Sequence, residues 1–204
     1  FDGPRQAPGG GALAAPKSGG QGTDMSSVSY LGRLLMDQGK LQEAELLLRR
    51  NLEARERTRG PEHRETLSSV SLLARLLMDQ GPGKLQEAEP LLRRVLEARE
   101  RTEGPEHEDT LTSVSSLGHL LMNQGKLQEA EPLLRRTLAA RERTLGPEHR
   151  ETLSSLCQLG QLLMQQGKLR EAEQCDTIYR IMADFDGPRQ APGGGDLSSS
   201  RLRL

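Results

Sequence analysis

Histidine and glutamate recur side by side along this chain, and such a pair is a common source of acid–base catalysis. His63, His107 and His149 each follow a glutamate in the segment Gly-Pro-Glu-His. An imidazole beside a carboxylate can take up or release a proton near neutral pH. The three pairs lie about one repeat apart, so they would not converge on one substrate atom. Their recurrence is explained better by a repeated structural unit, with each histidine in the loop that enters a helix.

Two further features contain residues that could serve in nucleophilic catalysis, metal binding or phosphate binding, but they lack the partner residues or the spacing that these functions need. Cys157 has no identifiable histidine or acid partner, and neither Cys157 nor Cys175 has a neighbour at metal-ligand spacing. The segment Gly-Ala-Leu-Ala-Ala-Pro-Lys-Ser resembles a phosphate-binding loop, but Pro16 stands where that loop needs glycine and offers no N–H to a phosphate. We therefore predict no catalytic residue, no cofactor and no metal site.

Composition excludes other classes of function. The 204 residues carry a formal net charge of -1 and include only two Phe, two Tyr and no Trp. Nucleic-acid binding is not expected, because neither a basic surface nor aromatic platforms for base stacking are indicated. No apolar run approaches the roughly 20 residues that cross a bilayer, so no membrane insertion is expected. Unpaired cysteines favour a reduced, cytoplasmic location. The start at Phe1 rather than Met suggests a processed or partial chain.

The elements that carry these residues come from an internal repeat. The segment Gly-Lys-Leu-Gln-Glu-Ala-Glu begins at Gly39, Gly83 and Gly125, and a variant with arginine for glutamine begins at Gly167. The repeat length is about 42 residues. One unit is two residues longer because of an insertion at residues 81–83. Such an insertion is tolerated best in a turn.

Each unit has the apolar spacing of two helices. In the second unit, Val70, Leu73, Ala74 and Leu77 share one helical face. A later amphipathic segment carries charge pairs at a spacing of four, which we expect to join Glu89 with Arg93 and Glu97 with Arg101. Neither helix can bury its apolar stripe alone, so the next unit must cover it. The alternative, a long coiled coil, conflicts with a glycine about every 20 residues.

These units resemble the tetratricopeptide repeat in the 42-residue form found in kinesin light chains. Small residues recur at matching positions of the first helix (Gly32, Ala74, Gly118 and Gly160) and of the second (Ala44, Ala88, Ala130 and Ala172). The resemblance implies an all-α, right-handed α-solenoid of about four helix-turn-helix units. The paired groove asparagines of kinesin light chains are absent, which puts kinesin-type cargo recognition in doubt. The lysine and asparagine set that clamps chaperone tails is absent too.

In this family the first helices line a concave surface, and helical spacing indicates which side chains face it. Arg33 and Arg75 could clamp a carboxylate there, while the methionines would form either a flexible apolar row or fillers between helices. The candidate groove residues are Ser29, Tyr30, Arg33, Met36, Asp37, Ser71, Leu72, Arg75, Met78, Asp79, Ser115, Ser116, His119, Met122, Asn123, Gln158, Gln161 and Met164. Ser26, Ser68, Thr112, Ser154, Cys157 and Gln165 occupy further positions on this face.

The two ends differ from the repeats. We predict a repeat domain at 24–183, with units at about 24–65, 66–109, 110–151 and 152–183, between disordered Gly- and Pro-rich segments at 1–23 and 184–204. The segment Phe-Asp-Gly-Pro-Arg-Gln-Ala-Pro-Gly-Gly-Gly occurs twice, at 1–11 and 185–195, as a recurring linker or as duplicated material without function. Asp176 replaces the leucine of the other units, so a weakened last helix is expected.

The architecture favours a non-catalytic scaffold or adaptor that binds protein or peptide segments on its concave face. The alternative is a structural or regulatory repeat array within a larger protein, without a groove ligand of its own. The near identity of the units favours this alternative, because recently duplicated repeats have not diverged to fit a ligand. Neither end has an obvious polar cap, so self-association or a continuing solenoid is also open.

Overall fold

The computed structural model describes residues 25–185, with side chains placed through residue 180. This part of the chain forms helices joined by short turns. The first helices of the units are α1 (Met25–Asp37), α3 (Arg64–Asp79), α5 (Glu108–Asn123) and α7 (Arg150–Gln165). The second helices are α2 (Leu41–Arg59), α4 (Leu85–Thr102), α6 (Leu127–Thr144) and α8 (Leu169–Phe185), and a short 3₁₀ helix η1 (Pro82–Lys84) precedes α4.

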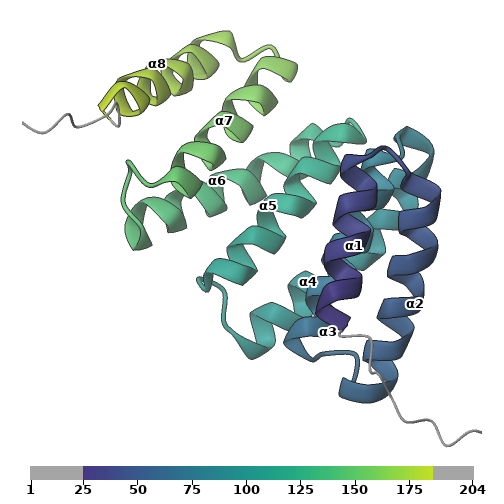
Figure 1. Ribbon diagram of the computed structural model, residues 1–204. Helices are drawn as coiled ribbons and strands as arrows, with labels where there is room; N and C mark the ends of the chain where they lie inside the picture. Colours follow the sequence, from purple (N-terminus) through teal and green to yellow (C-terminus); the bar gives the residue numbers. More distant parts are fainter. Residues whose placement is uncertain (1–24, 186–204) are drawn as a thin grey trace, which may run out of the picture.

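The helices pack in chain order as a curved array, with α1 and α8 at opposite ends (Figure 1). Each helix contacts mainly the one before it and the one after it, and the first helices α1 and α3, and α5 and α7, also meet. The expected α-solenoid is therefore confirmed, and the coiled-coil alternative is wrong. Short turns force consecutive helices to lie side by side, and the leftover apolar face of each unit is covered by its neighbour.

Glycine ends the first helices because the chain must turn through a left-handed conformation. Gly39 has φ +74°, its N–H donates to the Met36 carbonyl at 2.9 Å, and the N–H of Lys40 donates to the Leu35 carbonyl at 2.9 Å. This is the Schellman arrangement, in which otherwise unpaired helix carbonyls are satisfied. The same pattern recurs at Gly125 and Gly167. In the second unit the inserted residues form η1 instead.

The recurrent histidines begin the first helices. The Nδ1 atoms of His63, His107 and His149 each accept a hydrogen bond of 3.2 Å from the backbone N–H two residues later. Each histidine is thus the N-cap of α3, α5 or α7, a position that satisfies one of the free N–H groups at a helix start. The structural role predicted for these residues at the helix entrance is confirmed.

Buried arginines join each unit to the next. Arg55, Arg99 and Arg141 on the second helices are buried, and the Nη1 atom of each donates to a backbone carbonyl in the first turn of the following first helix, at 2.9, 2.7 and 3.2 Å. These arginines are the first residues of the Arg-Glu-Arg-Thr runs. From the sequence alone, such charge runs are most simply predicted to lie on solvent-exposed helix faces. That expectation is wrong for the first arginine of each run, because the carbonyls of the next unit hold it in the interior.

The exposed charges pair across units as well as along helices. Arg93 pairs with Glu89 at 2.8 Å, as its spacing predicts. Arg101 pairs with Glu62 of the preceding loop rather than with Glu97, so that predicted pair is wrong. The unit stacking brings the loop before α3 close to the end of α4, and this contact overrides the helical spacing.

The last unit departs from the others in its second helix. Asp176 is exposed, whereas the matching Leu48, Leu92 and Leu134 are buried. Leu169 and Ile178 are exposed as well. The helix α8 is nevertheless continuous to Phe185, two residues into the segment predicted to be a disordered tail. The predicted disorder of residues 1–23 and of the remaining tail lies outside the described residues.

Candidate functional site

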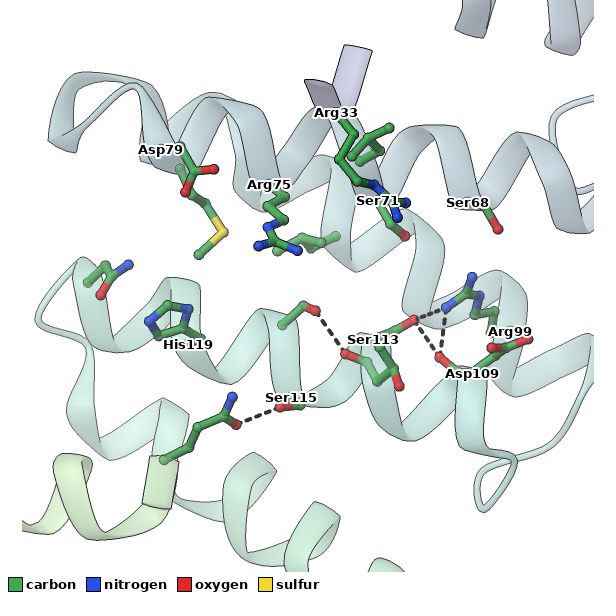
Figure 2. Close-up of a pocket in the computed structure, with 17 residues that line it drawn as sticks. Arg33, Ser68, Ser71, Arg75, Asp79, Arg99, Asp109, Ser113, Ser115 and His119 are labelled. Atoms are coloured by element: carbon green, nitrogen blue, oxygen red, sulfur yellow. Dashed lines mark hydrogen bonds between the residues drawn. The ribbon is translucent and has the colours of Figure 1, made fainter. Parts of the chain in front are cut away.

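A groove of about 560 Å³ lies between the first helices α3 and α5, with α1 and α7 at its margins (Figure 2). Its lining comes mainly from the first helices of two successive units. Most of its wall comes from side chains at matching positions of α3 and α5, because the repeat presents the same helical face in each unit.

The structure brings most of the predicted groove residues together. Eleven of the eighteen line this groove: Arg33, Ser71, Leu72, Arg75, Met78, Asp79, Ser115, Ser116, His119, Asn123 and Gln158. Ser68 and Thr112, which occupy further positions on the same face, line it too. The side chain of Gln158 reaches back to α5 and accepts a hydrogen bond of 2.6 Å from the Ser115 hydroxyl (Figure 2).

The other predicted residues lie elsewhere. Ser29 bonds to the Met25 carbonyl at 3.1 Å and accepts a bond from Asn51. Tyr30, which is 71% exposed, and Asp37, which is also exposed, lie on α1 but do not line the groove. Gln161 and Met164 line a separate cavity.

The methionines do not form one continuous row. Met122 is in the core, with 5% of its surface exposed, and Met36 is packed against the core. Met78 lies at the groove, half-buried, and Met164 is exposed. Three of the four methionines, Met36, Met78 and Met122, therefore pack in or against the core between helices. Of the four, only Met78 lines this groove, which favours the alternative that these methionines are fillers between helices over an apolar row.

Some groove residues escape a first-helix pattern. Leu92 and Arg99 come from the second helix α4, and Asp109 and Ser113 come from the inward side of the first turns of α5. Arginine recurs at this position of the second helix as Arg55, Arg99 and Arg141. This recurrence could have identified Arg99 as a residue with a defined place in each unit. The periodicity of the first helices alone does not indicate that side chains of a second helix reach the groove between them.

The groove carries positive charge that has no partner. Arg33 and Arg75 are exposed, and neither forms an ion pair or hydrogen bond with any residue of the described range 25–185 (Figure 2). Of the acids in the lining, Asp109 pairs with Arg64 at 2.9 Å, which leaves Asp79 unpaired within the same range. Two free guanidinium groups near hydroxyl side chains suit a ligand that bears carboxylates.

A second set of charges lies between successive second helices, away from the groove. Lys126 bonds to Glu89 at 2.9 Å, and this bond, with further bonds from Arg93 and Gln124, lowers the pKa of Glu89 to about 2. Lys168 bonds to Glu131 at 2.8 Å and, with Gln166 and Arg135, lowers the pKa of that carboxyl to about 2 as well. These networks stabilise the stacking of units.

The separate cavity, of about 510 Å³, lies between α7 and α8 and contains both cysteines. Burial raises the pKa of the Cys157 thiol and of the Cys175 thiol. A raised pKa keeps a thiol protonated at neutral pH, and a protonated thiol is a poor nucleophile. The exposed Asp176 borders this cavity, where the other units have a leucine that fills the space.

One group of side chains has metal-ligand character. Glu103, His107 and Asp109 offer ligand atoms that all lie within 4.8 Å of one another. The Nδ1 atom of His107 already accepts the N–H of Asp109, and the Asp109 carboxylate already holds Arg64. The convergence is therefore accounted for by the helix cap and an ion pair.

None of the helices described between residues 25 and 185 is long and apolar enough to cross a membrane.

Comparison with known proteins gives a family match over most of the helical array. Family models described as "Tetratricopeptide repeat" match residues 25–65, 66–109 and 112–177. No curated protein sequence matches the chain.

Solved structures share the architecture. Nearly identical TPR-like repeats of a proposed kinesin light chain from Podosopora anserina are 31% identical, with a TM-score of 0.71 over 82% of this chain and 78% of that one. BtubC from P. vanneervenii is 20% identical, with a TM-score of 0.71 over 88% and 70%. MamA from Desulfovibrio magneticus RS-1 is 15% identical, with a TM-score of 0.60 over 82% and 80%. The last two comparisons show the fold alone.

Proposed function

The chain belongs to the tetratricopeptide repeat family, whose members generally serve as protein-interaction scaffolds, and on that premise we propose that it binds a peptide segment of a partner protein in the groove between α3 and α5. The peptide lies along the first helices in an extended or helical form. Arg33 and Arg75 meet its acidic groups, and the hydroxyls of the groove bond to its backbone.

One observation carries this proposal: Arg33 and Arg75 face a common groove and have no partner within residues 25–185. Most other arginines of that range are engaged in ion pairs, such as Arg93 with Glu89 and Arg135 with Glu131. An unpaired guanidinium beside a concave surface can form bidentate bonds with a ligand carboxylate. The serines nearby add hydrogen bonds that tolerate several peptide sequences.

The test replaces both groove arginines in the full chain. The double variant Arg33→Glu/Arg75→Glu, used as bait in a cell lysate, should lose the partners that the unaltered chain retains. Circular dichroism should show the same helix content, since both side chains are exposed. A double variant of the same charge change, Arg50→Glu/Arg57→Glu, is the control, because these arginines of α2 are exposed and lie outside the groove. Unchanged partners in the groove variant would contradict the proposal.

A second function, that of an array packed against further repeats, is favoured by the exposed face of α1. Leu31 and Leu34 are 45% and 41% exposed, whereas the matching Leu73 and Leu76 are 1% and 0% exposed beneath the preceding second helix. Under this alternative, Leu31→Glu/Leu34→Glu changes the captured proteins and Arg33→Glu/Arg75→Glu does not. The two double variants therefore separate the candidates.

A further inference from the structure

The three buried arginines that join the units differ in their counter-charges. Arg55 pairs with Glu65 at 3.3 Å, and Arg141 pairs with Glu108 at 2.6 Å and with Glu151 at 3.6 Å. Within the described part of the chain, Arg99 donates only to the Asp109 carbonyl at 2.7 Å and to the Ser113 hydroxyl at 2.9 Å. No carboxylate pairs with Arg99 in the described range 25–185, although only 6% of its surface is exposed.

The sequence of the second unit explains the missing carboxylate. Glu108 stands at the start of α5 and reaches Arg141 on α6 of the same unit. The matching position before Arg99, at the start of α3, is Arg64. Arg64 is 71% exposed on its side chain and pairs with the Asp109 carboxylate. An arginine therefore replaces the acid that would neutralise Arg99, and it also engages Asp109, which matches the Glu65 and Glu151 partners of the other two arginines.

The surroundings of Arg141 show what a complete site looks like. Its Nη2 donates to the Glu108 carboxylate at 2.6 Å and to the Thr112 hydroxyl at 3.2 Å. The residue that matches Thr112 in the second unit is Ser68, which lines the groove together with Arg99 (Figure 2). The arginine and the hydroxyl are thus both present in the groove, and residues 25–185 supply no carboxylate that pairs with this arginine.

We propose that an acidic side chain of the bound peptide occupies this place and pairs with Arg99 beside Ser68, as Glu108 pairs with Arg141. The inference rests on the proposed peptide-binding function and names the chemistry of one subsite. A buried charge without a counter-charge is unfavourable, so a ligand carboxylate gains more here than at an exposed arginine. Charge-assisted hydrogen bonds to a guanidinium are also the strong ones.

The test supplies the missing carboxylate from within the chain. In Arg64→Glu the new acid occupies the position of Glu108 and should neutralise Arg99, which closes the subsite without removing Arg99 itself. Arg150→Glu is the matched control: Arg150 starts α7 at the same repeat position and is exposed, but Ala183 stands where its arginine partner would be. The probe is a short blocked oligoglutamate, with oligoglutamine as its neutral counterpart, titrated against ¹⁵N-labelled full chain.

The expected result is that oligoglutamate shifts the Nε resonance of Arg99 and that oligoglutamine does not. Its affinity should fall about tenfold or more in Arg64→Glu and less than about threefold in Arg150→Glu at the same salt concentration. Equal affinity in Arg64→Glu and the unaltered chain, or no binding of oligoglutamate at all, would overturn the subsite. If Arg33→Glu/Arg75→Glu still abolishes partner capture in those cases, the groove function stands and only the Arg99 subsite fails.

Discussion

Arg141 shows how a single side chain can fasten one repeat to the next. Its Nη1 donates to the Glu151 carbonyl and the Ser155 hydroxyl at 3.2 and 2.9 Å, and its Nη2 reaches the Glu108 carboxylate. The acceptors belong to α5 and α7, so one guanidinium on α6 contacts both neighbouring first helices. Arginine suits this place because its planar group presents five N–H donors in fixed directions, and it stays charged when buried.

Removing the Arg141 guanidinium should therefore weaken the stack of repeats. We expect Arg141→Met to lower the free energy of unfolding by about 1–3 kcal/mol, because buried acceptors lose their donor. Arg143→Met is the control: this arginine is 60% exposed on its side chain, and its loss should change stability by no more than about 0.5 kcal/mol. Urea denaturation followed by circular dichroism measures both, and similar losses would contradict the role of Arg141.

The carboxylates between second helices make a prediction about acid. Hydrogen bonds from Lys126 and Lys168 hold the folded-state pKa of Glu89 and Glu131 at about 2, against an ordinary value of 4.5. A lowered folded pKa means that the unfolded chain binds protons first as the pH falls. The stabilisation is thus fully present above about pH 5 and is lost between about pH 4.5 and pH 2.

The measurement is the melting temperature from pH 6 to pH 2.5. After allowance for solvent screening, each carboxylate should account for about 1 kcal/mol of the acid-induced loss. The variant Glu89→Gln/Glu131→Gln should be less stable at pH 6 and should lose less stability on acidification. Glu97→Gln/Glu142→Gln, which alters two glutamates without ion pairs in the described range, is the control. A parallel acid profile for both double variants would refute the assignment.

At the scale of the element, matching leucines of α1 and α3 have different surroundings. Leu73 lies between helices with 1% of its surface exposed, and Leu31 at the matching position of α1 is 45% exposed. Leu73→Ala should cost about 2–5 kcal/mol, since a cavity forms in the core. Leu31→Ala should cost less than about 1 kcal/mol, because much less apolar area is buried there. Chemical denaturation tests both, and a near-zero cost at Leu73 would mean that the helical register is wrong.

The same contrast shows what could be predicted from the sequence. Helix ends depend on residues close in the chain, such as Gly39 with Lys40 or the N-cap His63, so repetition of these signals was enough to place the helices. The burial of Arg99 depends on a carbonyl in the following unit, which no single-helix pattern contains. The groove itself depends on how neighbouring units pack, which places Arg75 and His119, at matching repeat positions, in one cavity and buries Met122 in the core.

At the scale of the whole molecule, the array is a chain of local contacts, and its ends differ from its middle. The stability of such a solenoid is close to a sum of unit and interface contributions. The central helices α4 and α6 each pack against first helices on both sides, whereas among the helices of residues 25–185 the main contacts of α8 are with α7. Units that lack one interface should open more often than central units.

The helix α8 should therefore be the least protected of the second helices α4, α6 and α8 in hydrogen exchange. Two local features add to the missing interface: Asp176 does not fill the cavity beside Gly160, and Ala183 cannot supply the arginine that follows in the other units.

Asp176→Leu should restore the buried contact of Leu134 and slow amide exchange in α8 by about tenfold, which is about 1.4 kcal/mol of local stability. Asp79→Leu, at an exposed position of α3, is the control and should leave exchange in α8 unchanged. If α8 exchanges as slowly as α6 in the unaltered chain, its stability does not depend on a following repeat. The array would then unfold cooperatively as a whole, and its stability could not be treated as a sum of unit and interface contributions.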